Sequence, residues 1–103
     1  MDKQIIVIGG GVVGCAVARL LSRYEAAVTV LEGGEDVAHG ASKANSGIVH
    51  AGFDAAPGSL KARLNVEGSV MYPALCAEVD APYSRPGAMV LAFSEEERRT
   101  IQT

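Results

Sequence analysis

The sequence predicts an α/β fold built on a Rossmann-like βαβ unit. Three observations indicate it: an apolar run at residues 5–8 leads into a cluster of glycines, a helical pattern follows, and a second apolar run at residues 28–31 ends on Glu32. This is the order of a strand, a crossover helix and a second parallel strand. The glycines and the terminal acid also match the fingerprint of a dinucleotide-binding turn.

The glycines of this turn follow the spacing Gly9-x-Gly11-x-x-Gly14. Gly9 allows a tight exit from the strand, the missing Cβ of Gly11 lets a pyrophosphate approach the backbone, and Gly14 lets the helix lie close to the strand. The helix presents its free N–H groups, including those of Val12 and Val13, and the positive end of its dipole to the phosphates.

Glu32 is the acid that the fingerprint places about 20 residues further on, where its carboxylate accepts hydrogen bonds from an adenosine ribose. A carboxylate there disfavours a 2′-phosphate, which leaves NAD and FAD, and the fingerprint alone does not choose between them. The alternative is a glycine-rich turn without a ligand. Because each glycine inside an element costs about 1 kcal/mol relative to alanine, a purely structural turn has little reason to use three in a row.

The crossover helix is predicted over residues 11–23. One apolar stripe on it is expected to pack on the sheet, formed by Val13, Val17, Leu20, Leu21 and Tyr24.

Residues 33–58 show no convincing helical pattern, although they are too apolar and too weakly charged for a disordered segment. The small residues in this stretch would let backbone groups and hydroxyls come close to a bulky ligand. The pattern is that of a segment laid along a cofactor.

A second helix is predicted to begin after Ser59, which is a suitable N-cap. Pro73 lacks an N–H group, so we expect a kink or a break near Tyr72.

The last part of the chain is predicted to form a strand at residues 88–93 and a final helix. Ser94 and Glu97 have the spacing of a capping box, and Glu95 can pair with Arg99 at i, i+4.

The composition of the 103 residues, with 49% hydrophobic and 20% charged residues, is that of one small globular domain. The net charge of −3 gives no basic patch and argues against a nucleic-acid partner. No apolar run is long enough to span a bilayer and no signal peptide is recognisable, so we expect a cytoplasmic protein, with peripheral membrane attachment left open. Cys15 and Cys76 lack metal-site spacing, so no metal site is expected, and Cys15 is interpreted as a small buried side chain.

Two further motifs carry a family resemblance: KANSGIVHAGFD at residues 43–54 and PGSLKA at residues 57–62. Together with GGGVVG and Glu32, they resemble the D-amino-acid-oxidase-type family of FAD-dependent oxidoreductases. Within it, the chain is most similar to glycerol-3-phosphate dehydrogenases of the anaerobic type. L-2-hydroxyglutarate dehydrogenases and oxidases share N-S-G-x-x-H-x-G and PGSLKA and are the alternative. The resemblance favours FAD over NAD.

The resemblance also implies roles for single residues. The three glycines would hold the pyrophosphate and Glu32 the ribose, while Ser42, Asn45 and Ser46 would line the remainder of the FAD. His50 would lie near the flavin ring as a catalytic acid or base, although a histidine in an apolar setting is often a hydrogen-bonded packing residue.

For the whole enzyme, the resemblance implies oxidation of glycerol 3-phosphate to dihydroxyacetone phosphate by hydride transfer to flavin, with electrons passing on to a quinone, a partner subunit or another acceptor. Family members are several times longer. Residues 1–82 are therefore expected to be the N-terminal part of the FAD-binding domain of a two-domain flavoprotein, and residues 83–103 the start of a substrate-domain strand and the helix after it. Alone, the chain is expected to be inactive. The second hypothesis is a truncated dinucleotide-binding module without catalysis.

Overall fold

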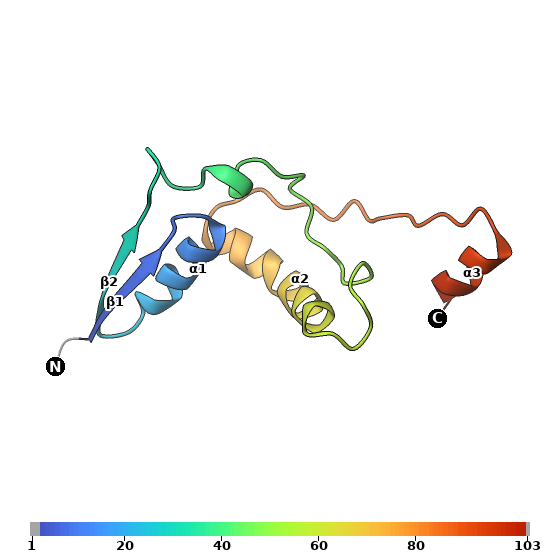
Figure 1. The fold of residues 1–103 in the computed structure, drawn as a ribbon, viewed down its shortest axis with the longest axis horizontal. Helices are drawn as coiled ribbons and strands as arrows, with labels where there is room; N and C mark the ends of the chain where they lie inside the picture. The colour runs from blue at the N-terminus through green and yellow to red at the C-terminus, as the bar shows by residue number, and fades with distance from the viewer. Residues whose placement is uncertain (1–2, 103) are drawn as a thin grey trace. The chain divides into compact units, whose positions relative to one another are not determined.

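A computed structural model describes residues 3–102 of the chain. Its elements, in chain order, are β1 (Lys3–Ile8), α1 (Val12–Leu21), β2 (Ala26–Leu31), the 3-10 turn η1 (Gly40–Ser42), α2 (Leu60–Glu78) and α3 (Glu95–Gln102), as Figure 1 shows. The chain divides into two compact units, residues 1–48 and 49–103, and each is described by itself.

The first unit is a βαβ unit, as predicted. Strands β1 and β2 pair in parallel, with Ile5 opposite Val28 and Ile8 opposite Leu31, and α1 forms the crossover between them. The β-branched residues of both strands suit an extended, pleated backbone. Parallel strands require such a crossover because no tight turn can join them.

Close packing between α1 and β1 depends on Gly14. A Cβ at this position would overlap the carbonyl oxygen of Gly9 and would lie 3.4 Å from Cγ1 of Val7. The helix therefore begins directly against the strand that precedes it, as the fingerprint predicts.

The predicted apolar stripe on α1 does not cover the sheet. Of its five residues only Leu21 is half-buried, and Val13 remains 74% exposed. The half-buried residues of the helix are Gly14, Ala18, Arg19 and Leu21. The prediction was wrong because the helix approaches β1 most closely at Gly14, and the valines beside it stay exposed.

The second unit is organised around α2. Its N-cap is Ser59, as predicted, with the hydroxyl oxygen accepting a hydrogen bond from the N–H of Ala62 at 3.1 Å. The helix continues through Pro73, so the chain does not break near Tyr72, and the alternative of a kink stays a prediction. Packing supports the helix on both sides of the proline, since the ring of Tyr72 stacks on that of Tyr83 at 6.5 Å and Cys76 is buried.

Residues 88–93 do not form the predicted strand. The structure places no neighbouring strand beside them within residues 3–102, and Met89 and Phe93 are each 88% exposed. A sequence with strand propensity still requires a partner for its backbone hydrogen bonds.

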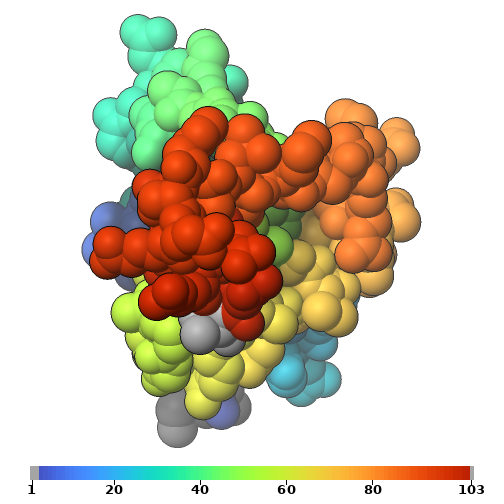
Figure 2. All heavy atoms as spheres, turned by 90° about the vertical axis from the view of Figure 1, so that its right-hand side faces the viewer, coloured from blue at the N-terminus to red at the C-terminus, as the bar shows by residue number. Residues whose placement is uncertain are grey.

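Helix α3 begins with the predicted capping box. The hydroxyl oxygen of Ser94 accepts from the N–H of Glu97 at 3.1 Å, and the Glu97 carboxylate accepts from the N–H of Phe93 at 2.7 Å. Glu95 pairs with Arg98 at 3.0 Å and not with the predicted Arg99. The helix is exposed along its described length and lies at the surface facing the viewer in Figure 2.

The predicted domain boundary between residues 82 and 83 stays a prediction. Residues 1, 2 and 103, at the outer ends of the two predicted segments, lie outside the described residues. Across the described range 3–102, no helix combines the length and the apolar character needed to cross a membrane.

Gly14→Ala is expected to lower the free energy of unfolding of the full-length protein by about 1–3 kcal/mol, as overpacking does, because the methyl group would overlap the Gly9 carbonyl oxygen. The control is Gly68→Ala within α2, where a Cβ meets nothing within 4 Å. That variant should raise the free energy of unfolding by about 0.5–1 kcal/mol. Urea denaturation measures both changes, and a stabilising effect of Gly14→Ala would contradict the packing described here.

Candidate functional site

The turn between β1 and α1 is held by backbone hydrogen bonds on both sides. Gly9 adopts a positive φ of 104°, and its N–H donates to the carbonyl oxygen of Leu31 at 2.7 Å. The carbonyl oxygen of the buried Gly10 accepts from the N–H of Ala38 at 2.8 Å. The glycine turn is thus tied to the end of β2 and to the loop that follows it.

Glu32 closes this arrangement with its carboxylate. One carboxylate oxygen accepts from the N–H of Gly34 at 2.9 Å and the other from the N–H of Gly10 at 2.7 Å. These bonds lower the pKa of Glu32 below its ordinary value, with the bond from Gly34 contributing most and the bond from Gly10 next. Together they outweigh desolvation, which raises the pKa. The predicted ribose acid is therefore a carboxylate at neutral pH that lies directly beside the glycine turn.

The N-terminus of α1 is capped from a distant part of the chain. Gly11 is the N-cap and offers no side chain, and the N–H of Val12 donates to the hydroxyl oxygen of Ser42 at 2.8 Å. A Cβ at Gly11 would lie 3.0 Å from that same oxygen. Turn η1 therefore brings Ser42 to the glycine turn, which places two separately predicted segments side by side.

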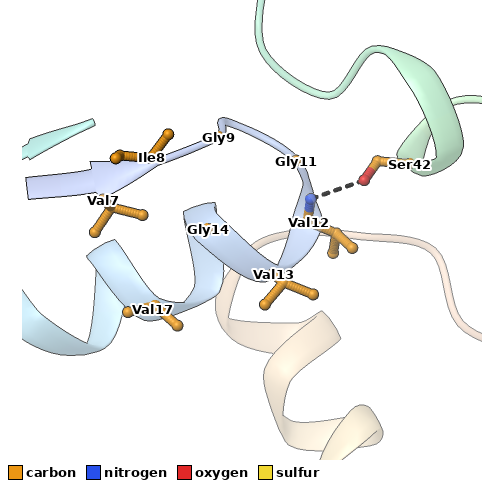
Figure 3. A pocket seen from close by; sticks show the side chains of 9 residues that line it. All are labelled: Val7, Ile8, Gly9, Gly11, Val12, Val13, Gly14, Val17 and Ser42. Atoms are coloured by element: carbon orange, nitrogen blue, oxygen red, sulfur yellow. Dashed lines mark hydrogen bonds between the residues drawn. The ribbon is translucent and has the colours of Figure 1, made fainter. Parts of the chain in front are cut away.

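A hollow of about 420 Å³ opens beside this helix start (Figure 3). Its size is that of a small-molecule site. It is lined by Val7, Ile8, Gly9, Gly11, Val12, Val13, Gly14, Val17 and Ser42. Six of the residues predicted to contact a cofactor are thus together at one site.

This hollow has the properties that a phosphate group needs. The helix start presents backbone N–H groups and the positive end of its dipole, and the missing side chains at Gly9 and Gly11 leave the backbone accessible. The residues present therefore fit the diphosphate of a dinucleotide.

Asn45 and Ser46 do not line the hollow. The amide nitrogen of Asn45 donates to the carbonyl oxygens of Ala41 and Ser42, at 2.9 and 3.0 Å, and its amide oxygen accepts from the N–H of Gly47 at 2.8 Å. Asn45 thus holds the loop that carries Ser42. Ser46 is exposed, and a cofactor contact by either residue stays a prediction.

His50 belongs to the second unit and lies outside any regular element. Its Nδ1 atom is 3.3 Å from a carboxylate oxygen of Asp54. Sequence reasoning missed this partner, although the spacing i, i+4 within the motif HAGFD could have indicated it. It also missed Gly10, whose position between two fingerprint glycines concealed its contact with Glu32.

Cys15 is exposed, contrary to the prediction that it is buried. Its thiol donates to the carbonyl oxygen of Gly10 at 3.4 Å, which keeps it beside the turn and not in a core. In the described part of the chain, no group of three or more His, Cys, Asp or Glu side chains could hold a metal ion.

Comparison with known proteins gives a family and several relatives. The family described as FAD dependent oxidoreductase matches residues 4–103. A glycerol 3-phosphate dehydrogenase of Caloramator mitchellensis is 46% identical over 98 residues, which cover 95% of this chain and 20% of the relative. A glycerol 3-phosphate oxidase of Mycoplasma pneumoniae is 34% identical over 97% of this chain and 26% of its own length. The mitochondrial L-2-hydroxyglutarate dehydrogenase of Homo sapiens is 35% identical over 96% of this chain and 22% of its own length.

Glu32→Gln is expected to destabilise the full-length protein near neutral pH, because an amide oxygen accepts more weakly from Gly10 and Gly34 than a carboxylate does. Because the pKa of Glu32 is lowered in the folded protein, the carboxylate stabilises the wild type at pH values above the ordinary glutamate pKa. This extra free energy of unfolding relative to Glu32→Gln is lost as the pH falls through the lowered pKa. Urea denaturation at a series of acidic pH values should show that the difference in free energy of unfolding between wild type and Glu32→Gln decreases. Glu35→Gln, in an exposed residue of the same loop, is the control, and a pH-independent difference for Glu32→Gln would contradict the assignment.

The family match extends from the first strand to the last residue of the chain, and it contains both the glycine turn and the segment that brings Ser42 to it. The chain spans about one fifth to one quarter of the length of the relatives compared here. The predictions of the fold, of the family and of FAD over NAD are confirmed. The chain belongs to the DAO family of FAD-dependent oxidoreductases.

Proposed function

We propose that this chain forms the nucleotide-binding part of an FAD-dependent dehydrogenase that oxidises glycerol 3-phosphate to dihydroxyacetone phosphate. FAD binding is supported by the contact between the Glu32 carboxylate and the glycine turn. The N-terminus of α1 borders the hollow beside this contact. The substrate part is supported by two relatives, which are named glycerol 3-phosphate dehydrogenase and glycerol 3-phosphate oxidase.

The residues around the turn would hold the dinucleotide. The backbone N–H of Val13 would bind the diphosphate, with Gly9 and Gly11 allowing its close approach, while the N–H of Val12 donates to Ser42. Each carboxylate oxygen of Glu32 has a second lone pair beyond its bond to the backbone, and these can accept from ribose hydroxyls.

Ser42 would take part in the same contact. Its hydroxyl accepts from Val12 and can at the same time donate to a phosphate oxygen. Asn45 and Ser46 would follow along the cofactor, as the sequence predicts.

When bound, FAD supplies a two-electron acceptor for the oxidation of a secondary alcohol. The protein positions the alcohol and excludes water, and His50 accepts the hydroxyl proton at its Nε2 atom. The electrons would pass on to a quinone, a partner subunit or another acceptor. The expected cytoplasmic location stays a prediction of the sequence.

L-2-hydroxyglutarate is the second candidate substrate. A relative from Caenorhabditis elegans, named mitochondrial L-2-hydroxyglutarate dehydrogenase, is 38% identical over 91% of this chain and 22% of its own length. Both candidates are secondary alcohols that carry anionic groups, so the same proton transfer at His50 would serve either.

Turnover measurements distinguish the two substrates. Full-length protein reconstituted with FAD should show a flavin absorption spectrum and should reduce an artificial electron acceptor with glycerol 3-phosphate faster than with L-2-hydroxyglutarate. The reverse preference would support the second candidate. Bound flavin without turnover of either substrate would favour a non-catalytic dinucleotide-binding module, and a protein that stays colourless would overturn the proposal.

Gly11→Val is expected to weaken FAD binding by the full-length protein by at least about tenfold, equivalent to 1.4 kcal/mol. The added side chain would press on the Ser42 hydroxyl and would block the approach to the backbone. Titration of the apoprotein with FAD, followed by flavin fluorescence, measures the change. Gly68→Ala is the control, and equal affinities for the two variants would contradict the proposed contact.

A further inference from the structure

The pair of His50 and Asp54 differs in origin from the i, i+4 ion pair of Arg63 and Glu67 in the same unit. Arg63 and Glu67 lie on α2, where helical geometry alone brings residues four apart together, and their charged atoms are 3.5 Å apart. His50 and Asp54 lie outside any helix, and a turn of the loop brings them to 3.3 Å.

That turn is built around Gly52. Its φ of 111° lies in the region that favours glycine, and a Cβ there would lie 2.7 Å from Cγ2 of Val66 on α2. Ala55, directly after the pair, is buried. The loop therefore approaches α2 at Gly52 and is buried at Ala55, so the backbone is held on either side of Asp54.

We propose that Asp54 is a positioning residue for His50. With its carboxylate 3.3 Å from Nδ1, it would favour the proton on that nitrogen and so leave Nε2 unprotonated and able to accept the proton of the substrate hydroxyl. The inference rests on the proposed function. The orientation of the His50 imidazole affects turnover only if His50 accepts the substrate proton.

The chemistry of the two groups fixes which nitrogen carries the proton. A neutral imidazole has one N–H and one bare nitrogen, whereas an ionised carboxylate only accepts hydrogen bonds. The nitrogen beside Asp54 is Nδ1, so the tautomer that satisfies both groups has its lone pair on Nε2.

Stability does not account for the pair. The side chains of His50 and Asp54 are 59% and 60% exposed, and exposed ion pairs contribute little to folding because water screens them. The consequence of the contact is therefore the orientation and the tautomer of the imidazole.

The test compares Asp54→Ala with Glu67→Ala in the FAD-loaded full-length protein. Glu67→Ala removes a carboxylate of similar exposure from an i, i+4 pair of the same unit and does not touch His50. The first measurement is the ¹⁵N spectrum of histidine-labelled protein, assigned with His50→Gln. The second is kcat with the substrate that the enzyme turns over.

In the wild-type protein, the spectrum should show His50 protonated at Nδ1. Asp54→Ala should shift the population toward the form protonated at Nε2 and should lower kcat by about two- to fivefold, the range over which an exposed pair can bias the imidazole. Glu67→Ala should change neither quantity. Asp54→Glu should restore part of both, and adding Asp54→Ala to His50→Gln should cause no further loss.

Each failure has its own signature. If the variants bind flavin and turn over, but Asp54→Ala leaves the His50 spectrum and kcat as in the wild type, the positioning role is wrong while the proposed function stands. If His50→Gln has wild-type kcat, the role of His50 in the proposed function is wrong, and this inference fails with it. A colourless wild-type protein would overturn the proposed function itself, whatever the His50 spectrum shows.

Discussion

The hydrogen bond from the backbone N–H of Gly10 to the Glu32 carboxylate is the contact on which the nucleotide-binding end of the first unit depends. It joins the exit of one strand to the end of the next, and the bond from Ala38 to the Gly10 carbonyl oxygen draws in the following loop. A Cβ at Gly10 would lie 3.0 Å from both the Glu32 carboxylate and Val37. Gly10 lies between the fingerprint glycines Gly9 and Gly11, and the space around it leaves little room for a side chain.

Local chemistry explains which parts of the fold could be predicted from the sequence. The βαβ unit and the cap at Ser59 follow from patterns of residue types along the chain, and both were confirmed. The strand at residues 88–93 needs a partner strand, and the sheet-facing role of Val13 depends on how side chains fit together; neither shows in such a pattern, and both predictions were wrong. No break occurs at Pro73, because packing around α2 determines whether a helix tolerates a proline.

The candidate site was predicted in part. The spacing of the glycines and of the acid is a local signal. Ser42, which is joined to Val12 across a long loop, was indicated only as one of several small residues and by the family resemblance. The contact of Gly10 with Glu32 and that of Asp54 with His50 went unnoticed. For both pairs the sequence shows the residue types, but it does not show the turn of the backbone that brings the two residues together.

Two carboxylates thus act in comparable ways in the two units. Glu32 fixes the backbone that would receive the diphosphate, and Asp54 is proposed to fix the imidazole that would receive a proton. Each lies near a glycine whose missing side chain permits a close approach, of Glu32 to Gly10 in the first unit and of Val66 to Gly52 in the second. Preorganisation of this kind lowers the cost of ordering a site at the moment of binding.

The outer side of β1 has a consequence for biosynthesis. In the described residues β1 pairs with β2 alone, and Ile6 and Ile8 are 63% and 87% exposed. During synthesis, such an edge offers main-chain groups and branched aliphatic side chains to neighbouring polypeptides. Aggregation of the nascent chain through β1 is therefore one route by which the yield of folded protein falls.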